Sequence, residues 1–281
     1  MASPLSKKIT LNDLRRARVE GTKVPMLTCY DFTTARVMQE AGVPMLLVGD
    51  SAANVILGHE TTLPVSLRFM SELAGAVRRG APLAFVVADM PFGSYQGSVA
   101  RGTRNACLMV QLSGCDCVKL EVAAGHAPLI RELADAGVAV MAHIGLRPQA
   151  VGLIGGYRYQ GRSAREAEAI VTLALQMQDA GAATILLEAV PPEVGQRVVE
   201  RTELPVIGCG AGPHCHGSVI VTHDGIGLSQ HRPRFAPELG DVATPMRQAF
   251  ETYVRRVRSG EYPAAEHQYE MLPEEKEKFP H

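Results

Sequence analysis

Short apolar runs recur along this chain at similar intervals. They are rich in Val, Ile, Leu and Ala and do not alternate strictly with polar residues, a pattern typical of strands covered on both faces. Eight such runs lie at residues 26–30, 45–50, 83–90, 117–121, 138–145, 184–190, 205–210 and 218–224. The pattern therefore predicts eight buried strands.

Helical patterns fill most of the gaps between these runs. Clear examples cover residues 32–42, 127–137 and 163–181, and each closes on a Gly suited to the position that follows a helix. Strand and helix alternating over 281 residues predict an α/β fold, a single (β/α)8 TIM-type barrel, with a doubly wound sheet as the alternative. The connection 210–217 is too short for a full helix, so we expect one irregular unit.

Further helices are predicted outside the repeating units. Residues 11–21 form an amphipathic pattern in which Thr10 and Asp13 are placed as a capping box, and we expect this helix to cover the bottom of the barrel. Residues 245–260 predict a C-terminal helix. We expect one domain over 1–281, with 268–281 as a flexible tail.

Charge and cysteine content narrow the class of partner. The formal net charge is −1 without a long basic block, which argues against nucleic acid, and no stretch approaches the roughly 18 apolar residues that span a membrane. The six cysteines are spread through predicted strands and helices, as in proteins with reduced thiols. We therefore expect a cytoplasmic protein that binds a small molecule.

Polar side chains sit at the ends of several predicted strands. They are Asp50, Ser51, Asp89, Lys119, Glu121, His143 and Glu188. In a barrel the C-terminal ends of the strands form one rim, where active sites lie. We therefore expect these side chains to meet at one mouth.

The acids at this rim suggest a metal site. Asp50, Asp89 and Glu121 are hard oxygen donors of the kind that Mg²⁺ prefers, although each acid alone could instead cap the end of its strand. Glu188 closes an apolar strand and is the best candidate for a general base, the alternative being an acid paired with Lys or Arg. His143 alone could be a core histidine, but beside Lys119 it is a candidate anion ligand.

Several stretches together resemble one known family. LTCYDFTTARVMQEAGVPMLLVGDSAANVILGHETTLPV is similar to the start of the ketopantoate hydroxymethyltransferase (3-methyl-2-oxobutanoate hydroxymethyltransferase) family. VVADMPFGSY, VKLE, AHIGLRPQ, GGYRYQGR, LLEAVP, PVIGCGAG and EYPAAEH follow in that family's order. The resemblance extends from about Lys8 to His267.

The resemblance implies a Mg²⁺-dependent enzyme of pantothenate biosynthesis. It would transfer a one-carbon unit from 5,10-methylenetetrahydrofolate to 3-methyl-2-oxobutanoate through an enolate stabilised by the ion, giving ketopantoate. By the same resemblance, the metal ligands are Asp50, Asp89 and Glu121, with Glu121 binding through water. Ser51, Lys119 and His143 hold the oxo acid together with Asp50 and Asp89, and Glu188 is the base. The family also implies a homo-oligomer, often a decamer.

Two other functions fit the same residues. One is a different Mg²⁺-enolate lyase or transferase of the phosphoenolpyruvate/pyruvate barrel group, and the other is a non-catalytic barrel that binds oxo acids. Two stretches depart from the family pattern. Val122–Ala123 stand where the family usually has two glycines, and His216-Gly217-Ser218 stand where Asp-Gly-Gln is common.

Overall fold

The sheet is a closed barrel of eight parallel strands. The computed structural model describes residues 3–279. Each strand pairs in parallel with the next, and β8 pairs with β1. The strands are β1 (Val24–Thr28), β2 (Met45–Val48), β3 (Phe85–Asp89), β4 (Cys117–Glu121), β5 (Val140–Gly145), β6 (Thr184–Glu188), β7 (Val206–Cys209) and β8 (Gly217–Ile220). The prediction of a (β/α)8 barrel is confirmed, and the doubly wound alternative is wrong because the sheet closes.

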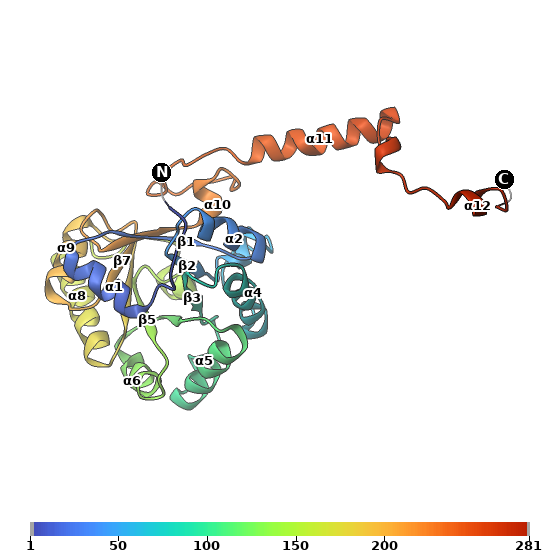
Figure 1. The fold of residues 1–281 in the computed structure, drawn as a ribbon. Helices are drawn as coiled ribbons and strands as arrows, with labels where there is room; N and C mark the ends of the chain where they lie inside the picture. The colour runs from blue at the N-terminus through green and yellow to red at the C-terminus, as the bar shows by residue number, and fades with distance from the viewer. Residues whose placement is uncertain (1–2, 280–281) are drawn as a thin grey trace.

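Helices lie between most of the strands and surround the barrel, and the helices near the C-terminus extend away from it (Figure 1). They are α1 (Leu11–Glu20), α2 (Phe32–Glu40), α3 (Ala52–Val55), α4 (Leu67–Gly80), α5 (Val99–Ser113), α6 (Ala127–Asp135), α7 (Val151–Ile154), α8 (Ala164–Asp179), α9 (Pro192–Arg201), α10 (Thr222–Gly225), α11 (Ala243–Ser259) and α12 (Pro273–Lys276). Three 3₁₀ turns are η1 (Ala124–His126), η2 (Pro148–Ala150) and η3 (Ala265–His267). In the described chain β8 follows β7 without a helix between them, which confirms the irregular seventh unit.

Two apolar clusters hold the barrel together. The inner cluster fills the barrel with strand side chains, including Met45, Phe85 and Met141. The outer cluster packs the other face of the strands against the helices. Burial on both faces is the physical reason why the strands are continuous apolar runs.

Helix α1 covers the bottom of the barrel as expected. The Asp13 carboxylate accepts a hydrogen bond from the Thr10 backbone N–H at 2.9 Å, and the Asp13 N–H donates to the Thr10 hydroxyl at 3.4 Å. Both bonds of the predicted capping box are therefore present. From this helix Leu14 is buried in the inner cluster, which closes that end of the barrel.

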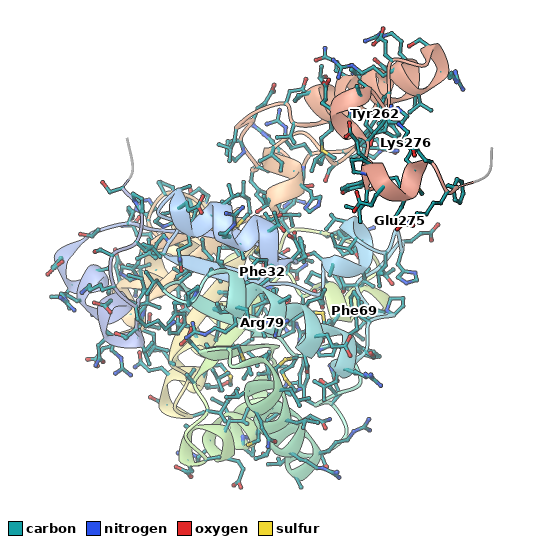
Figure 2. All side chains as sticks on the ribbon, turned by 45° about the vertical axis from the view of Figure 1, so that its right-hand side comes forward. Phe32, Phe69, Arg79, Tyr262, Glu275 and Lys276 are labelled. Carbon is teal, nitrogen blue, oxygen red and sulfur yellow. The ribbon has the colours of Figure 1, made fainter. Side chains whose placement is uncertain are left out.

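The C-terminal segment leaves the barrel. Figure 1 shows α11 extending away from the strands, and Figure 2 shows Tyr262 and Lys276 on this arm, apart from Phe32 and Arg79 on the barrel. The arm includes the predicted tail 268–281, of which residues 280 and 281 lie outside the described chain, and its flexibility stays a prediction. No helix within residues 3–279 is long and apolar enough to span a bilayer.

Candidate active site

All seven polar residues predicted from the strand ends line one cavity. It has a volume of about 910 Å³ and opens at the C-terminal ends of the strands. The shared lining residues are Asp50, Ser51, Asp89, Lys119, Glu121, His143 and Glu188. Barrel closure therefore gathers side chains that are far apart in the sequence, as expected from their positions.

Lys119 lies at the centre of the buried charges. Its Nζ lies 3.0 Å from Asp89 Oδ1 and 3.2 Å from His143 Nδ1. Burial by itself lowers the pKa of Lys119, but the carboxylates of Asp89, Asp50 and Glu121 outweigh it and raise the pKa above its ordinary value. Lys119 is therefore an ammonium held among acids.

His143 connects this ammonium to Glu188. Its Nε2 lies 3.2 Å from Glu188 Oε2. Burial, followed by the charge of Lys119, lowers the pKa of His143, so the imidazole is neutral at pH 7. Because Lys119 can donate only to an unprotonated Nδ1, we assign the imidazole proton to Nε2, next to Glu188.

The partner of Glu188 differs from the alternative considered from the sequence. Among residues 3–279 no Lys or Arg forms an ion pair with Glu188. Its carboxylate lies instead beside the neutral imidazole of His143. Glu188 is half-buried, with 18% of its side chain exposed, while His143 is buried. The carboxylate is therefore open to a molecule in the cavity.

The backbone around Glu188 is unusual. Ala189 has φ of 49°, which is strained for a residue other than Gly. Across the strand pair, Gly145 has φ of 90°, and a Cβ there would collide with the Glu188 carbonyl oxygen. Together these features fix the position from which the Glu188 side chain enters the cavity.

Asp50 and Asp89 lie side by side. The Asp50 backbone N–H donates to Asp89 Oδ2 at 2.9 Å, and a Cβ at the neighbouring Gly49 would lie 2.7 Å from the Ser51 hydroxyl oxygen. The Ser51 hydroxyl itself lies 2.9 Å from the hydroxyl of Tyr30.

Burial disfavours the ionised form of two carboxyl groups at this site. Burial raises the pKa of Asp89 to about 7, with Lys119 opposing and Asp50 adding to the shift. Burial likewise raises the pKa of Glu121 to about 9, against the effect of Lys119. Three buried acids, Asp50, Asp89 and Glu121, thus share one ammonium, and a bound cation would offset this imbalance.

These residues fit a divalent ion that takes few protein ligands. Asp89 Oδ1 is buried and has no partner with hydrogen-bond geometry within the described residues, although Lys119 Nζ is close. Over the same range, no three His, Cys, Asp or Glu side chains form a ready metal cluster. Mg²⁺ suits such a site, because it commonly takes one or two carboxylates and completes its shell with water and substrate oxygens.

Sequence reasoning missed the residues that hold these acids in place. Gln149 and Tyr95 are buried beside Glu121 and hydrogen-bond to it. Gln149 is the last residue of AHIGLRPQ, and Tyr95 is the last residue of VVADMPFGSY, two of the stretches that resemble the family. Their place in these stretches was the signal that could have identified them. Neither stands at a strand end, so strand-end reasoning did not find them.

Aromatic side chains line the outer part of the cavity. Tyr157, Tyr159 and Phe235 each expose between 43% and 59% of their surface there. Large exposed aromatic residues beside a polar pocket are typical of ligand sites.

A closed α/β barrel whose strand ends carry a partly exposed carboxylate, an ammonium and paired acids in one cavity defines a barrel enzyme that acts on a small anionic substrate. A family model described as ketopantoate hydroxymethyltransferase matches residues 8–265. The chain belongs to the ketopantoate hydroxymethyltransferase family.

Curated relatives agree with this assignment along nearly the whole chain. The chain is 44% identical to a 3-methyl-2-oxobutanoate hydroxymethyltransferase of Frankia alni, with 95% of this chain and 88% of that protein covered. Enzymes of the same name from Chloroflexus aurantiacus and Thermobifida fusca are 44% and 41% identical, with 95% and 94% of both chains covered, respectively.

Solved structures show likeness of fold alone. A phosphoenolpyruvate phosphomutase from Streptomyces platensis subsp. rosaceus has a TM-score of 0.61 at 14% identity, covering 90% of this chain and 88% of that one. A phosphonopyruvate hydrolase solved with oxalate and Mg++ has a TM-score of 0.60 at 13% identity, covering 92% and 93%. These neighbours share a barrel fold with this chain, whereas the family model and the curated relatives assign the chain to the hydroxymethyltransferases.

Proposed function

We propose that this protein transfers a hydroxymethyl group to 3-methyl-2-oxobutanoate, giving ketopantoate for pantothenate biosynthesis. Family membership supports the reaction, and the observation that carries the chemistry is the single cavity shared by Glu188, Lys119 and the paired acids Asp50 and Asp89. The one-carbon donor is 5,10-methylenetetrahydrofolate. The cytoplasm is the proposed location.

Asp50 and Asp89 would hold Mg²⁺, with Glu121 contributing through water. When bound, the ion supplies a Lewis acid that polarises the ketone of the oxo acid. A structural neighbour, phosphonopyruvate hydrolase, was solved with Mg++ and the small dicarboxylate oxalate.

The chain's own residues then carry out a proton transfer. Glu188 takes the C3 proton of the oxo acid, and Lys119 stabilises the negative charge that develops on the substrate oxygen. Neutral His143 keeps its Nε2 proton beside Glu188, 3.2 Å from Oε2. Ser51 would bind the substrate carboxylate.

The carbon–carbon bond forms in the next step. The C3 carbanion equivalent attacks the methylene carbon of the folate-derived iminium. Hydrolysis of the adduct then breaks the carbon–nitrogen bond, so that water gives its hydroxyl to the methylene carbon and its proton to the nitrogen of the released tetrahydrofolate. The aromatic rim formed by Tyr157, Tyr159 and Phe235 offers surfaces for the flat rings of the folate.

Deuterium exchange at C3 of 3-methyl-2-oxobutanoate tests this function stepwise. Exchange that requires Mg²⁺, followed by ketopantoate formation when methylenetetrahydrofolate is added, is the expected result. Exchange without hydroxymethyl transfer would point to another Mg²⁺-enolate enzyme with a different electrophile. Loss of both would leave only the non-catalytic barrel that binds oxo acids.

We also propose a homo-oligomer, with the decamer as its expected size. The apolar stripe of α11 is exposed and consists of Met246, Phe250, Tyr253, Val254 and Val257. In the described chain, β8 is followed on the barrel by the short α10 alone, before α11 extends away. The outward residues Pro25 of β1 and Ser218 of β8 are exposed, whereas every residue of β3 is buried. We propose that α11 of a second copy covers this face.

A further inference from the structure

Gln149 joins the loops above half of the barrel. It lies in η2, just after β5, and its side chain is buried. Through side chain and backbone it contacts residues that follow or end β2, β3 and β4. No part of the proposed reaction uses it directly.

The orientation of its amide is fixed by what surrounds it. Nε2 donates to Asp50 Oδ2 at 2.8 Å and to the Met90 carbonyl at 3.0 Å. Oε1 accepts from the Tyr95 hydroxyl at 2.9 Å and from Gln96 Nε2 at 3.2 Å. Because acceptors face the amide nitrogen and donors face the oxygen, a flipped amide would lose these bonds.

The backbone of the same residue holds a second acid. The Gln149 N–H donates to both oxygens of Glu121, at 3.1 and 2.9 Å. The hydroxyl of Tyr95 accepts from the Glu121 N–H at 3.1 Å, so it supports Glu121 and the Gln149 amide together. One residue thus fixes Asp50 with its side chain and Glu121 with its backbone.

Such contacts decide how a buried carboxylate presents its oxygens. With Oδ2 of Asp50 held by Gln149, Oδ1 is left for a ligand in the cavity. Partners of this kind around metal ligands orient the ligands and commonly change metal affinity about 10–100-fold when removed. We propose that Gln149 is a positioning residue that sets Asp50 for binding of the divalent ion, an inference that rests on the proposed function.

The test is Mg²⁺ affinity measured by isothermal titration calorimetry, with and without 3-methyl-2-oxobutanoate. Gln149→Met keeps the length of the side chain and the backbone bonds to Glu121 but removes the donor to Asp50. We expect its Mg²⁺ affinity to fall roughly 10–100-fold. Tyr95→Phe removes the hydroxyl that holds Oε1 and accepts from the Glu121 N–H, but it leaves the donor to Asp50 in place, so we expect a smaller fall in affinity.

Gln160→Met is the matched control. Its amide donates to the Arg158 carbonyl and touches none of the acids, so its Mg²⁺ affinity should equal that of the unchanged protein. A purely structural role of Gln149 would lower the melting temperature of the variant without changing its ion affinity.

Unchanged affinity in folded Gln149→Met overturns the inference. If that variant does not fold, unchanged affinity in Tyr95→Phe overturns it equally. Failure of the unchanged protein to bind Mg²⁺ would overturn the proposed metal site, and this inference with it.

Discussion

Glu188 Oε2 lies 3.2 Å from His143 Nε2, across neighbouring strands β6 and β5. Lys119 Nζ lies 3.2 Å from Nδ1, the other nitrogen of the same imidazole. The imidazole therefore lies between the proposed base Glu188 and the ammonium of Lys119. Within residues 3–279, Lys119 pairs with Asp89 and forms no ion pair with Glu188.

The first prediction concerns this base. Glu188→Gln keeps the shape of the side chain but removes its basicity, so C3 deuterium exchange followed by NMR should fall at least about 100-fold. Mg²⁺ binding measured by calorimetry should stay unchanged. Glu193→Gln makes the same substitution at an exposed position of α9 and should exchange normally. Exchange at the normal rate in Glu188→Gln would refute its role as the base.

A second prediction uses the backbone beside Glu188. Gly145→Ala should destabilise the protein by more than about 1–3 kcal/mol, since the new Cβ adds a collision with the Glu188 carbonyl to the strain of a positive φ. Urea unfolding would measure this loss of stability. Any folded fraction should catalyse deuterium exchange at C3 of 3-methyl-2-oxobutanoate slowly. Gly152→Ala is the control, because a Cβ there meets no atom within 4 Å and the residue lies in α7. Equal stability of the two variants would contradict the account of this turn.

A third prediction concerns pH and His216, one of the departures from the family pattern. Its Nδ1 accepts a hydrogen bond from the Val206 N–H at 3.0 Å. Burial, followed by the charges of Arg18 and Lys23, lowers the pKa of His216 to about 4. The folded protein therefore favours the neutral imidazole.

The sign of the pH effect follows from this shift. Below an unfolded pKa of about 6.5 the unfolded chain binds a proton that the folded chain rejects. The stabilisation is thus complete above pH 6.5 and is lost as pH falls towards 4. His216→Gln, whose side-chain oxygen can accept the same bond, should flatten the fall of the urea midpoint between pH 6.5 and 4. His214→Gln, at an exposed position, should follow the unchanged protein.

A fourth prediction tests the second copy. Phe250→Glu with Val254→Glu places two charges on the apolar stripe of α11, so light scattering after gel filtration should show a smaller assembly. Gln248→Glu with Thr252→Glu adds the same charges on the opposite side of the helix and should leave the mass unchanged. If both double variants kept the mass of the unchanged protein, α11 would be excluded as the contact between copies.

Much of the fold could be read from local patterns, because burial on both faces leaves continuous apolar runs and helix ends leave Gly and capping residues. All eight strands lie at the predicted runs, and the predicted capping of α1 by Thr10 and Asp13 is present. The position of the α11 arm could not be predicted, because the same amphipathic pattern serves a helix packed on its own barrel or on another copy.

The sequence by itself determined which acids, base and ammonium stand at strand ends, since alternation along a strand and the direction of the chain place them at one rim. Only the tertiary structure decided how they pair. That His143 stands between Lys119 and Glu188, and that Gln149 holds both Asp50 and Glu121, depends on the register between strands and on the path of the loop after β5. Distances of 3 Å between residues remote in the chain are set by barrel closure and packing, and no local pattern records them.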